Sequence, residues 1–477
     1  MPDYDVIVIG AGTGGLTVAK LTAGAGKRVL VVERGEPGGD CLWTGCVPTK
    51  AIIECARRLH EARNSSSFGV LDNGVGFDFQ AVRRHVAASQ KQAGRIDSAS
   101  TIAKAGIELR RGLAAFVDAH TVSVDGATVT ASTIVIATGG EPVVPPIPGL
   151  RECNPDTNVQ LVAWETLPQS LAIIGGGPIG VEFGQALGRL GVTVTVIEAA
   201  DRILEREEPA ASELITSILR REGVDVRTGT KVANVRRDDG MNALTLAAKD
   251  GKNSTISAER VLVATGRKAE VEDLHLERAG VAFSNQGVTV DETLRSSQSN
   301  IFAVGDVTGG YHFTHVAEAQ GRLVANILTA GRVSRRFQKW SDRIVPRVTY
   351  TDPEVASVGF TVEQARASRR NVRSWDVPFA DIDRAIVMGR TEGYVKLVTA
   401  RGWQRWVPGL SGLAGDEIVG ASIVGPHAGD LLMPIVNTMR MRLPIGMLAW
   451  NMQAYPTLAL GVRQAAGLPF DRPVPPA

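Results

Sequence analysis

Residues 5–15 read DVIVIGAGTGG, a short apolar run that ends in a glycine-rich turn. The turn places Gly10, Gly12 and Gly15 in a G-x-G-x-x-G spacing ahead of an apolar helical pattern. A strand, this turn and a helix suit a pyrophosphate, because glycine lets the backbone approach the phosphates and the helix amino terminus offers free N–H groups. The next apolar run ends at Glu33, where such a fold places the carboxylate that accepts ribose hydroxyls.

The same pattern returns 165 residues later in the chain. Residues 171–180, LAIIGGGPIG, hold Gly175, Gly177 and Gly180, and the strand that follows the next helix ends at Glu198. One motif of this type is a weak signal, but agreement of four positions at one offset predicts two nucleotide-binding folds in this chain.

Two further apolar runs end in matching Thr–Gly turns, one after each glycine motif. They read IVIATG over residues 134–139 and VLVATG over residues 261–266, and we expect them to be the closing strands of the two folds. Residues 141–149, EPVVPPIPG, lie between the folds, and their prolines fix φ and lack N–H donors. This stretch predicts a stiff connector, with a domain boundary near residue 150.

Length and charge restrict the class of protein. A chain of 477 residues is too long for one core and predicts two to four domains. Its 52 Lys and Arg against 50 Asp and Glu leave a net charge of +2 without long blocks of one sign, so we expect small-molecule partners and no nucleic acid or membrane surface. The chain has no apolar run of about 18 residues and starts MPDYDVIVIG, without a basic leader, so we expect a cytoplasmic protein.

Two of the four cysteines, Cys41 and Cys46, lie in residues 39–50, GDCLWTGCVPTK. Four cysteines make no disulfide framework, so a close pair in a reducing compartment is typical of catalysis or metal binding. Neither cysteine has a neighbour of metal-ligand type, and we expect no metal site. Gly45 permits a distorted turn, and Pro48 marks the first turn of a helix whose amino terminus favours a thiolate at Cys46.

This cysteine stretch, IFAVGDVT at residues 301–308 and PRVTYTDPEVASVGFT at residues 346–361 resemble the FAD-dependent pyridine nucleotide-disulfide oxidoreductases. The family includes lipoamide dehydrogenase, glutathione reductase and mercuric reductase, and the resemblance covers nearly the whole chain. It implies an α/β fold with two Rossmann-like domains, for FAD and NAD, and a C-terminal α+β dimerisation domain. The implied division is 1–150 with 275–343 for FAD, 151–274 for NAD(P) and 344–477 for the dimerisation domain.

The resemblance also implies roles for individual residues. Glu33 would hold the adenosine ribose of FAD, Asp306 would bind the ribityl chain, and Lys50 with Glu182 would form an ion pair beside the reactive edge of the flavin. The residues expected at FAD are Gly10, Gly12, Gly15, Glu33, Lys50, Thr138, Gly139, Asp306 and Ala317. The residues expected at NAD are Gly175, Gly177, Gly180, Glu198 and Gly266.

The expected pyridine nucleotide is NADH. Gly180 and Glu198 suit a free 2′-hydroxyl, whereas a 2′-phosphate would be repelled by this carboxylate. Arg202 keeps NADPH as the alternative. Pro178 stands where many members of the family have a tyrosine that shields the flavin until nicotinamide arrives, so this chain departs from the family in its gating.

The implied electron path runs from NADH through FAD to a redox-active Cys41–Cys46 disulfide, with Cys46 at the flavin and Cys41 free to attack a substrate. In disulfide reductases of the family, the partner subunit of a homodimer completes this site with a His-Pro-x-x-x-Glu acid–base pair. Here the stretch reads YPTLAL, so Tyr455 and Leu460 replace both residues. A phenol titrates near pH 10, and loss of a positioned acid or base typically costs about 10² to 10⁴ in rate.

Other residues offer no obvious replacement for the missing pair. We expect His312, His315 and His427 to be structural, and Cys55 and Cys153 to be buried small residues. Residues 401–409, RGWQRWVPG, are expected to be a hairpin loop between two strands of the dimerisation domain.

Three functions stay open at this stage. The first is a lipoamide dehydrogenase-like enzyme that acts on a sulfur substrate with an unusual proton source. The second is an NAD(P)H-dependent reductase of quinones or metal ions, although the carboxyl-terminal cysteine pair that mercuric reductase uses as a relay is absent, since the last cysteine is Cys153. The third is a redox-sensing flavoprotein without metabolic turnover.

Overall fold

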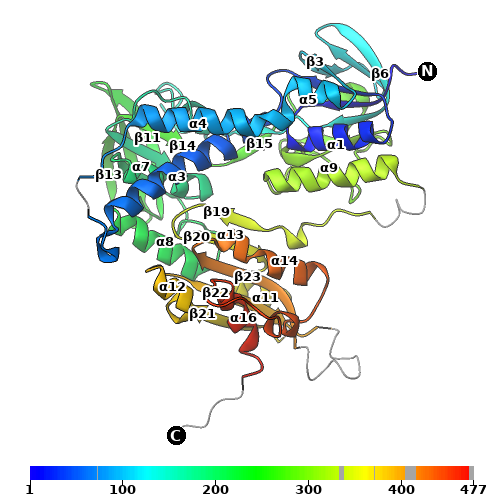
Figure 1. Ribbon diagram of the computed structural model, residues 1–477. Coiled ribbons are helices and arrows are strands. Elements are labelled where there is room, and N and C mark those ends of the chain that lie inside the picture. Colours follow the sequence, from blue (N-terminus) through cyan, green and yellow to red (C-terminus); the bar gives the residue numbers. More distant parts are fainter. Residues whose placement is uncertain (72–73, 332–337, 370, 403–414, 472–477) are drawn as a thin grey trace.

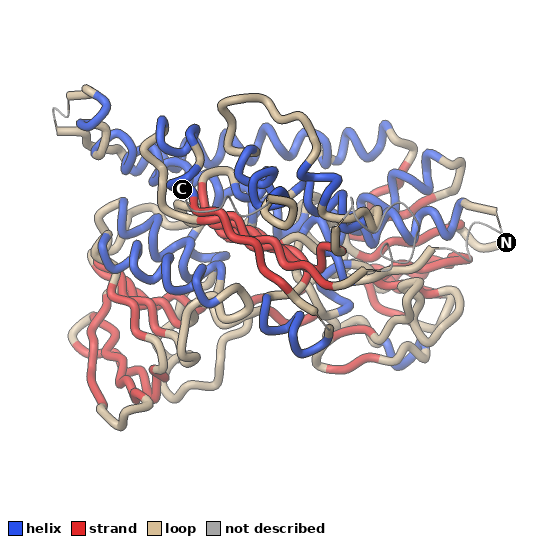
Figure 2. The backbone as a smooth tube through the Cα atoms, turned by 90° about the horizontal axis from the view of Figure 1, so that it is seen from below, coloured by secondary structure: helices blue, strands red, loops and turns tan. Residues whose placement is uncertain are grey.

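The computed structural model describes residues 1–71, 74–331, 338–369, 371–402 and 415–471. Figure 1 shows three groups of elements: a blue and cyan group joined by yellow-green helix α9, a green group, and an orange and red group that ends at the carboxyl terminus. In Figure 2, seen from below, the strands of the antiparallel sheet of the third group run across the front of the view. The chain is an α/β protein with two parallel sheets and a C-terminal α+β unit, which confirms the predicted fold class.

The first sheet has strand order β3-β2-β1-β6-β5-β4, with β18 also paired to β6. Its strands are β1 (Tyr4–Ile9), β2 (Val29–Glu33), β3 (Ile107–Arg111), β4 (Ala114–Phe116), β5 (Thr121–Val124), β6 (Ala127–Ile136) and β18 (Ile301–Ala303). The pairs among β1, β2, β3, β6 and β18 are parallel. The apolar runs of β1, β2 and β18 and the end of β6 are buried, whereas β3, at the edge of the sheet, buries only Ile107. Helices α1 (Thr13–Gly24) and α9 (Thr314–Thr329) pack against each other beside this sheet, so the late segment with β18 and α9 returns to the first fold (Figure 1).

The second sheet is fully parallel, with order β10-β9-β8-β14. Its strands are β8 (Ser170–Ile174), β9 (Thr193–Ile197), β10 (Asp225–Arg227) and β14 (Arg260–Val263), and its helices are α6 (Asn158–Leu161), α7 (Pro178–Arg189) and α8 (Pro209–Arg221). An antiparallel sheet of β11 (Thr230–Asp238), β12 (Met241–Ala248) and β13 (Asn253–Ala258) adjoins it. The first two residues of the predicted proline-rich connector, Glu141 and Pro142, belong to β7 (Gly140–Pro142), which pairs with β15 (Arg267–Ala269), and the rest of the connector follows this strand.

The third sheet is antiparallel, with order β19-β20-β23-β22-β21. Its strands are β19 (Arg347–Thr349), β20 (Glu354–Gly359), β21 (Arg373–Pro378), β22 (Tyr394–Ala400) and β23 (Glu417–Gly425). Its helices are α11 (Val362–Ser368), α12 (Asp383–Val387), α13 (Ala428–Leu431), α14 (Met433–Arg440), α15 (Gly446–Ala449) and α16 (Leu460–Gly467). Both strands predicted to flank the hairpin loop are present, whereas residues 403–409 of that loop lie outside the described residues.

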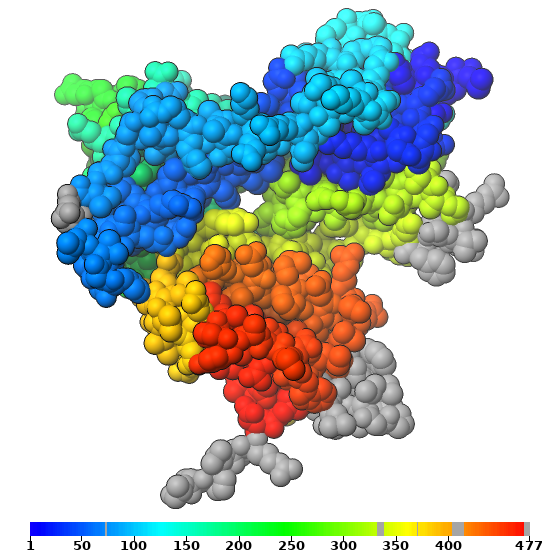
Figure 3. Space-filling model, viewed as in Figure 1, coloured from blue at the N-terminus to red at the C-terminus, as the bar shows by residue number. Residues whose placement is uncertain are grey.

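The cysteine stretch forms α2 (Gly39–Trp43) and the start of α3 (Cys46–Arg63). Helices α3 and α4 (Phe79–Ala93) lie side by side and extend from the first group of elements toward the second (Figure 1). The space-filling view is hollowed between the dark blue part of the chain and the yellow-green segment (Figure 3). The first turns of α3 lie where the three groups meet, because Cys46 contacts Thr314 of α9 and Lys50 contacts Glu182 of α7 and the ring of Tyr350.

Smaller elements include α5 (Ala99–Lys104), β16 (Phe283–Ser284), β17 (Gly287–Val288) and 3-10 turns at Ser66–Phe68, Gly94–Asp97, Leu276–Ala279, Gly305–Thr308, Asp342–Ile344 and Phe379–Asp381. Within the part of the chain that the structure describes, no helix is both long and apolar enough to cross a bilayer.

Candidate active site

The first glycine turn is closed by contacts that only glycine allows. Gly10 has φ +104°, and a Cβ on it would collide with the carbonyl of Ala137 at the end of the neighbouring strand. A Cβ on Gly15 would collide with the carbonyl oxygen of Gly10. The start of α1 is therefore held directly against the strand ends, as a pyrophosphate-binding turn requires.

The second turn repeats this geometry. Gly175 has φ +114° and is packed against the carbonyl of Ala264, and a Cβ on Gly180 would collide with the carbonyl oxygen of Gly175. Gly177, the middle glycine, has open space within 4 Å of where a Cβ would stand. The backbone at the amino terminus of α7 is therefore accessible at Gly177.

Both predicted carboxylates brace the turn that precedes them. Glu33 accepts hydrogen bonds from the N–H groups of Ala11, at 2.7 Å, and Gly35, at 2.8 Å. Glu198 accepts from Gly176 at 2.6 Å and from Ala200 at 2.7 Å. Each donor in the second set stands 165 residues after its counterpart, so the repeat extends to individual atoms.

The remaining predicted cofactor residues surround the same openings. Gly139, at φ +80°, and Gly266, at φ +128°, each face open space after their strands, while the hydroxyl of Thr138 donates to the carbonyl oxygen of Glu270 at 2.7 Å. Ala317 in α9 packs on the first glycine helix, since a Cβ on Gly14 would lie 3.2 Å from its carbonyl oxygen. Open space beside Gly139 in the first fold and beside Gly177 and Gly266 in the second, each near a helix amino terminus and a carboxylate, fits FAD and a nicotinamide nucleotide.

Arg267 is a site residue that the sequence reasoning missed. Its Nε lies 3.3 Å from the Asp306 carboxylate, and its Nη2 bonds both the Asp40 carboxylate and the carbonyl oxygen of Gly140. The guanidinium therefore joins the residue predicted for the ribityl chain to the residue before Cys41. The only sequence signal is its position directly after Gly266 in the second Thr–Gly turn.

Cys41 in α2 and Cys46 at the start of α3 are thiols in this structure. Their mutual hydrogen bond lowers the pKa of Cys46 to about 6, helped by the Thr314 hydroxyl 3.4 Å from its Sγ and by the Lys50 ammonium. The same bond, together with burial, raises the pKa of Cys41. The pair therefore holds one proton near neutral pH, with the thiolate on Cys46.

Lys50 and Glu182 form an ion pair, with 2.8 Å between Nζ and Oε2. Glu182 is only 4% exposed, and its other oxygen accepts the N–H of Tyr350 at 2.8 Å. The ammonium lies 4.8 Å from the centroid of the Tyr350 ring. Burial opposes the charge on Lys50, but the Glu182 carboxylate outweighs it and raises the pKa of this lysine. A fixed cation thus stands one helical turn beyond Cys46.

Residues 4–321 match the family described as pyridine nucleotide-disulphide oxidoreductase, and residues 345–466 match the dimerisation domain of the same family. The chain belongs to this family. It is therefore an oxidoreductase that uses FAD and NAD(P)H, and the recognition of the family from its sequence motifs is confirmed.

Mercuric reductases and dihydrolipoyl dehydrogenases are among the relatives of this oxidoreductase. It is 33% identical to mercuric reductase of Staphylococcus aureus over 99% of its length and 83% of that protein. It is 34% identical to dihydrolipoyl dehydrogenase of Bacillus subtilis strain 168 over 90% of each chain. Among solved structures, the Cu(II) complex of the HOCl-induced flavoprotein disulfide reductase RclA from Escherichia coli matches with TM-score 0.83 and 28% identity, over 96% of this chain and 98% of that chain.

Tyr455, which replaces the acid–base histidine of the family, is 71% exposed in the loop between α15 and α16. A hydrogen bond with the Asp383 carboxylate raises the pKa of this phenol. Among the described contacts, none joins Tyr455 to Cys41 or Cys46 of the same chain. At neutral pH its hydroxyl is therefore protonated and engaged with a carboxylate.

The histidines have other partners. Burial lowers the pKa of His315, whose Nε2 lies 2.9 Å from the carbonyl oxygen of Pro346 and whose ring stacks on Phe313. Burial also lowers the pKa of His312, although the Asp306 carboxylate opposes this effect. His427 lies at the start of α13 with φ +56°. Within the described part of the chain, none of these three rings forms a hydrogen bond or ion pair with Cys41 or Cys46.

Two expectations about other cysteines had different outcomes. Cys153 is buried, at 5% exposure, as predicted. Cys55 is only partly buried, although its i−4 and i+4 neighbours Ala51 and Leu59 in α3 are buried; that prediction was wrong.

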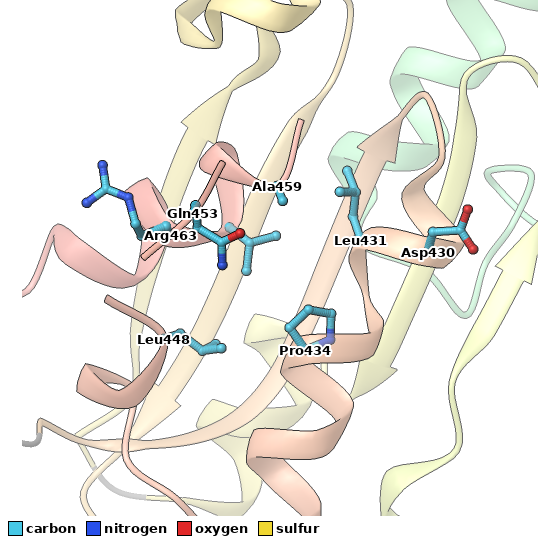
Figure 4. A pocket seen from close by; sticks show the side chains of 8 residues that line it. Asp430, Leu431, Pro434, Leu448, Gln453, Ala459 and Arg463 are labelled. Atoms are coloured by element: carbon cyan, nitrogen blue, oxygen red, sulfur yellow. The ribbon is translucent and has the colours of Figure 1, made fainter. Parts of the chain in front are cut away.

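A small cavity of about 70 Å³ lies in the dimerisation domain, between α13, α14, α15 and α16 (Figure 4). It is lined by Asp430, Leu431, Pro434, Leu448, Gln453, Ala459, Val462 and Arg463. Gln453 and Ala459 lie on either side of Tyr455 in the sequence, but none of the lining residues is a predicted site residue. Among the described residues, no group of three or more His, Cys, Asp or Glu side chains could hold a metal ion.

Proposed function

We propose that this flavoenzyme oxidises NADH and uses the Cys41–Cys46 dithiol to reduce a soft metal ion. When bound, FAD supplies the two-electron exchange between nicotinamide and thiol. The dithiol loses two electrons and its remaining protons as the S–S bond forms, and these electrons pass to one ion that accepts two or to two ions that accept one each. The protons go to solvent, so the step requires no acid from the protein.

The observation that carries this proposal is Tyr455. Reduction of an organic disulfide expels a thiolate that needs a proton, and the family supplies it from a histidine at this position. A phenol whose pKa is raised by Asp383 is a poor acid at neutral pH. A metal ion bound to thiolates has no such leaving group, and soft thiolate ligands select ions of this kind. The mercuric reductases among the relatives and the Cu(II) complex among the solved structures support the same acceptor.

We infer the cofactor contacts from the two glycine turns. The residues proposed to hold FAD are Gly10, Gly12, Gly15, Glu33, Lys50, Thr138, Gly139, Arg267, Asp306 and Ala317. The residues proposed to hold NADH are Gly175, Gly177, Gly180, Glu198 and Gly266. Glu198 would repel a 2′-phosphate, which favours NADH over NADPH. Arg202 donates through Nη2 to the carbonyl oxygen of Glu205, while its Nη1 has no hydrogen-bond partner among the described residues, so this arginine keeps NADPH as the alternative.

We further propose that the active site is shared between two copies of the chain. The match of residues 345–466 to the family dimerisation domain supports a homodimer. In that arrangement Tyr455 of one subunit would approach the cysteines of the other. The domain division that we propose is 1–150 with 275–343 for FAD, 151–274 for NAD(P) and 344–477 for dimerisation.

A second candidate acceptor is a small organic disulfide, as in the dihydrolipoyl dehydrogenases among the relatives. One observation favours it: the Tyr455 hydroxyl is held by Asp383, so a positioned O–H group exists where the family has its acid. This pair would be the unusual proton source, with a low rate because of its high pKa.

An acceptor panel separates the two candidates. We expect the anaerobic holoenzyme to oxidise NADH faster with Hg²⁺ or Cu²⁺ than with lipoamide or glutathione disulfide. Tyr455→His should raise disulfide turnover, by up to about 10² to 10⁴, because it restores an acid that titrates near neutrality. Efficient lipoamide turnover by the unaltered enzyme, lost in Tyr455→Phe, would instead support the disulfide candidate.

A further inference from the structure

The turn between the two cysteines is held tightly at its start. The carbonyl oxygen of Asp40 accepts the N–H groups of Thr44, at 2.9 Å, and Gly45, at 2.5 Å. A Cβ on Gly45 would stand 2.9 Å from that oxygen and 3.3 Å from Cα of Cys41, so the chain passes directly over the first cysteine. This backbone decides how far apart the two sulfur atoms lie.

Three consecutive carbonyl groups at the end of α2 have no partner within the helix, as is usual at a helix carboxyl terminus. Gln90 in α4 satisfies two of them: its Nε2 donates to Leu42 at 3.2 Å and to Trp43 at 2.9 Å. Asn158 satisfies the third, since its Nδ2 donates to the carbonyl oxygen of Thr44 at 2.9 Å. Every residue between the cysteines except Gly45 is thus fixed by a side-chain amide from another segment.

The two residues that carry these amides are themselves held in place by other contacts. Asn158 is only 7% exposed and opens α6, whose start is closed by a reciprocal capping pair. Two residues earlier, Asp156 bonds to the second sheet, donating to Val261 and accepting from Val263, each at 2.8 Å. Gln90 lies in the last turn of α4, which packs along α3. The turn is therefore held between the helix beside Cys46 and the sheet of the second nucleotide fold.

We propose that Gln90 and Asn158 are positioning residues that keep the Cys41 and Cys46 sulfur atoms together in the dithiol and so set its reducing power. This proposal rests on the assignment of these cysteines as the redox pair. The side-chain amides touch neither sulfur and act only through the backbone between them.

The direction of the effect follows from effective concentration. A turn that holds two thiols close raises the effective concentration of one for the other, which stabilises the disulfide and makes the dithiol a stronger reductant. Without the amides, the turn samples arrangements with the sulfur atoms apart. If the equilibrium constant for forming the disulfide from the dithiol falls tenfold, the reduction potential of the cysteine pair rises by about 30 mV.

A second consequence concerns protonation. The pKa of Cys46 is held near 6 chiefly by its hydrogen bond with Cys41, and this bond needs the sulfur atoms side by side. A looser turn should therefore raise the pKa of Cys46 toward the ordinary thiol value. A role confined to folding stability would change neither this pKa nor the potential.

The test uses the FAD-loaded enzyme with Gln90→Leu and Asn158→Leu, and Gln80→Leu as the matched control. Gln80 lies on the same helix, and its Nε2 likewise donates to a backbone carbonyl of the second fold, that of Glu165 at 2.8 Å, but far along the helix from the cysteine turn. The dithiol–disulfide equilibrium is measured against dithiothreitol by alkylation and mass analysis, and the thiolate is titrated by absorbance at 240 nm.

We expect about a tenfold fall in the equilibrium constant in each Leu variant at position 90 or 158, a raised Cys46 pKa, and no change in Gln80→Leu. Values equal to those of the control in both variants would overturn the proposal. If Asn158→Leu does not fold, Gln90→Glu replaces it, because a carboxylate of the same size repels the two carbonyl oxygens and should shift the equilibrium further. An unaltered enzyme without any redox-active dithiol would instead contradict the proposed function.

Discussion

The two glycine turns have equivalent hydrogen bonds at positions 165 residues apart in the sequence, but the segments that follow them make different contacts. After Glu33 the chain runs into α2 and the cysteine pair. After Glu198 it runs to Glu207 and Glu208, which pair with Arg347 and Lys396 of the third sheet. The two regions share the turn that we propose to hold a nucleotide, whereas the cysteine pair follows the first turn.

The equivalent helices show the same contrast. Position 17 in α1 corresponds to position 182 in α7. Thr17 donates its hydroxyl to the carbonyl oxygen of Thr13 within its own helix, whereas Glu182 reaches Lys50 in α3 and the backbone of Tyr350. In both regions the glycine turn is held by bonds within its own fold, whereas the ion pair near Cys46 joins Lys50 of the first region to Glu182 of the second.

The largest effect is expected when the redox group unique to the first region is removed. Cys46→Ser should reduce NADH-dependent turnover of any acceptor that uses the dithiol to the background rate, because no disulfide can form. FAD content should stay at the level of the unaltered enzyme, since the glycine turn is untouched. Steady-state NADH oxidation and the flavin-to-protein absorbance ratio check both points, and full turnover in this variant would remove the dithiol from the path.

The next effect comes from the contact that joins the two regions. Glu182→Gln leaves Lys50 without its counter-charge, and because this carboxylate raises the pKa of Lys50, the pKa of the lysine should fall. We expect NADH-driven reduction of the bound flavin to slow by about tenfold or more, as for other fixed charges at a reacting centre.

The matched control for this variant is Thr17→Val at the equivalent position of α1, and stopped-flow measurement at several pH values compares the two. Equal rates in both variants would show that the ion pair does not serve the reaction.

A moderate effect concerns pH. The thiolate of Cys46, whose pKa is lowered to about 6 by Cys41 and Thr314, should be present above pH 6 and protonated as pH falls through this value. In the two-electron-reduced enzyme the long-wavelength thiolate–flavin absorbance should therefore be lost below about pH 6. Thr314→Val removes a hydrogen bond that lowers this pKa, so its midpoint should move upward. A midpoint that does not move would exclude Thr314 as a stabiliser of the thiolate.

The smallest effects should divide between the two turns. Glu33→Gln should weaken FAD binding and Glu198→Gln should weaken NADH binding, each by about tenfold, because each replaces a carboxylate that accepts two N–H bonds. Glu198→Gln should also improve the relative use of NADPH. FAD release on dialysis and the KM for NADH and NADPH are measured for both variants. If Glu33→Gln weakened NADH binding, or Glu198→Gln weakened FAD binding, as much as the other variant does, the assignment of one carboxylate to each nucleotide would be contradicted.

The outcome for the sequence predictions follows the same contrast. The glycine turns, both carboxylates and the start of a helix at Cys46 were predictable, because each depends on residues close together in the chain. Arg267, Gln90, Asn158 and Thr314 were not, since each acts through a bond to a distant segment and leaves no local pattern. Lys50 with Glu182 was anticipated only from the family resemblance, and Cys55 shows that helical spacing alone did not settle its burial.

The most direct test of the central claim is an anaerobic titration of the FAD-bound enzyme with NADH, followed by absorbance. An active Cys41–Cys46 disulfide doubles the electron capacity of the enzyme, so we expect the first equivalent of NADH to give long-wavelength absorbance and the second to complete bleaching of the flavin. Cys46→Ser should bleach with the first equivalent and without that absorbance. Complete bleaching of the unaltered enzyme by one equivalent, with no long-wavelength absorbance, would contradict the account.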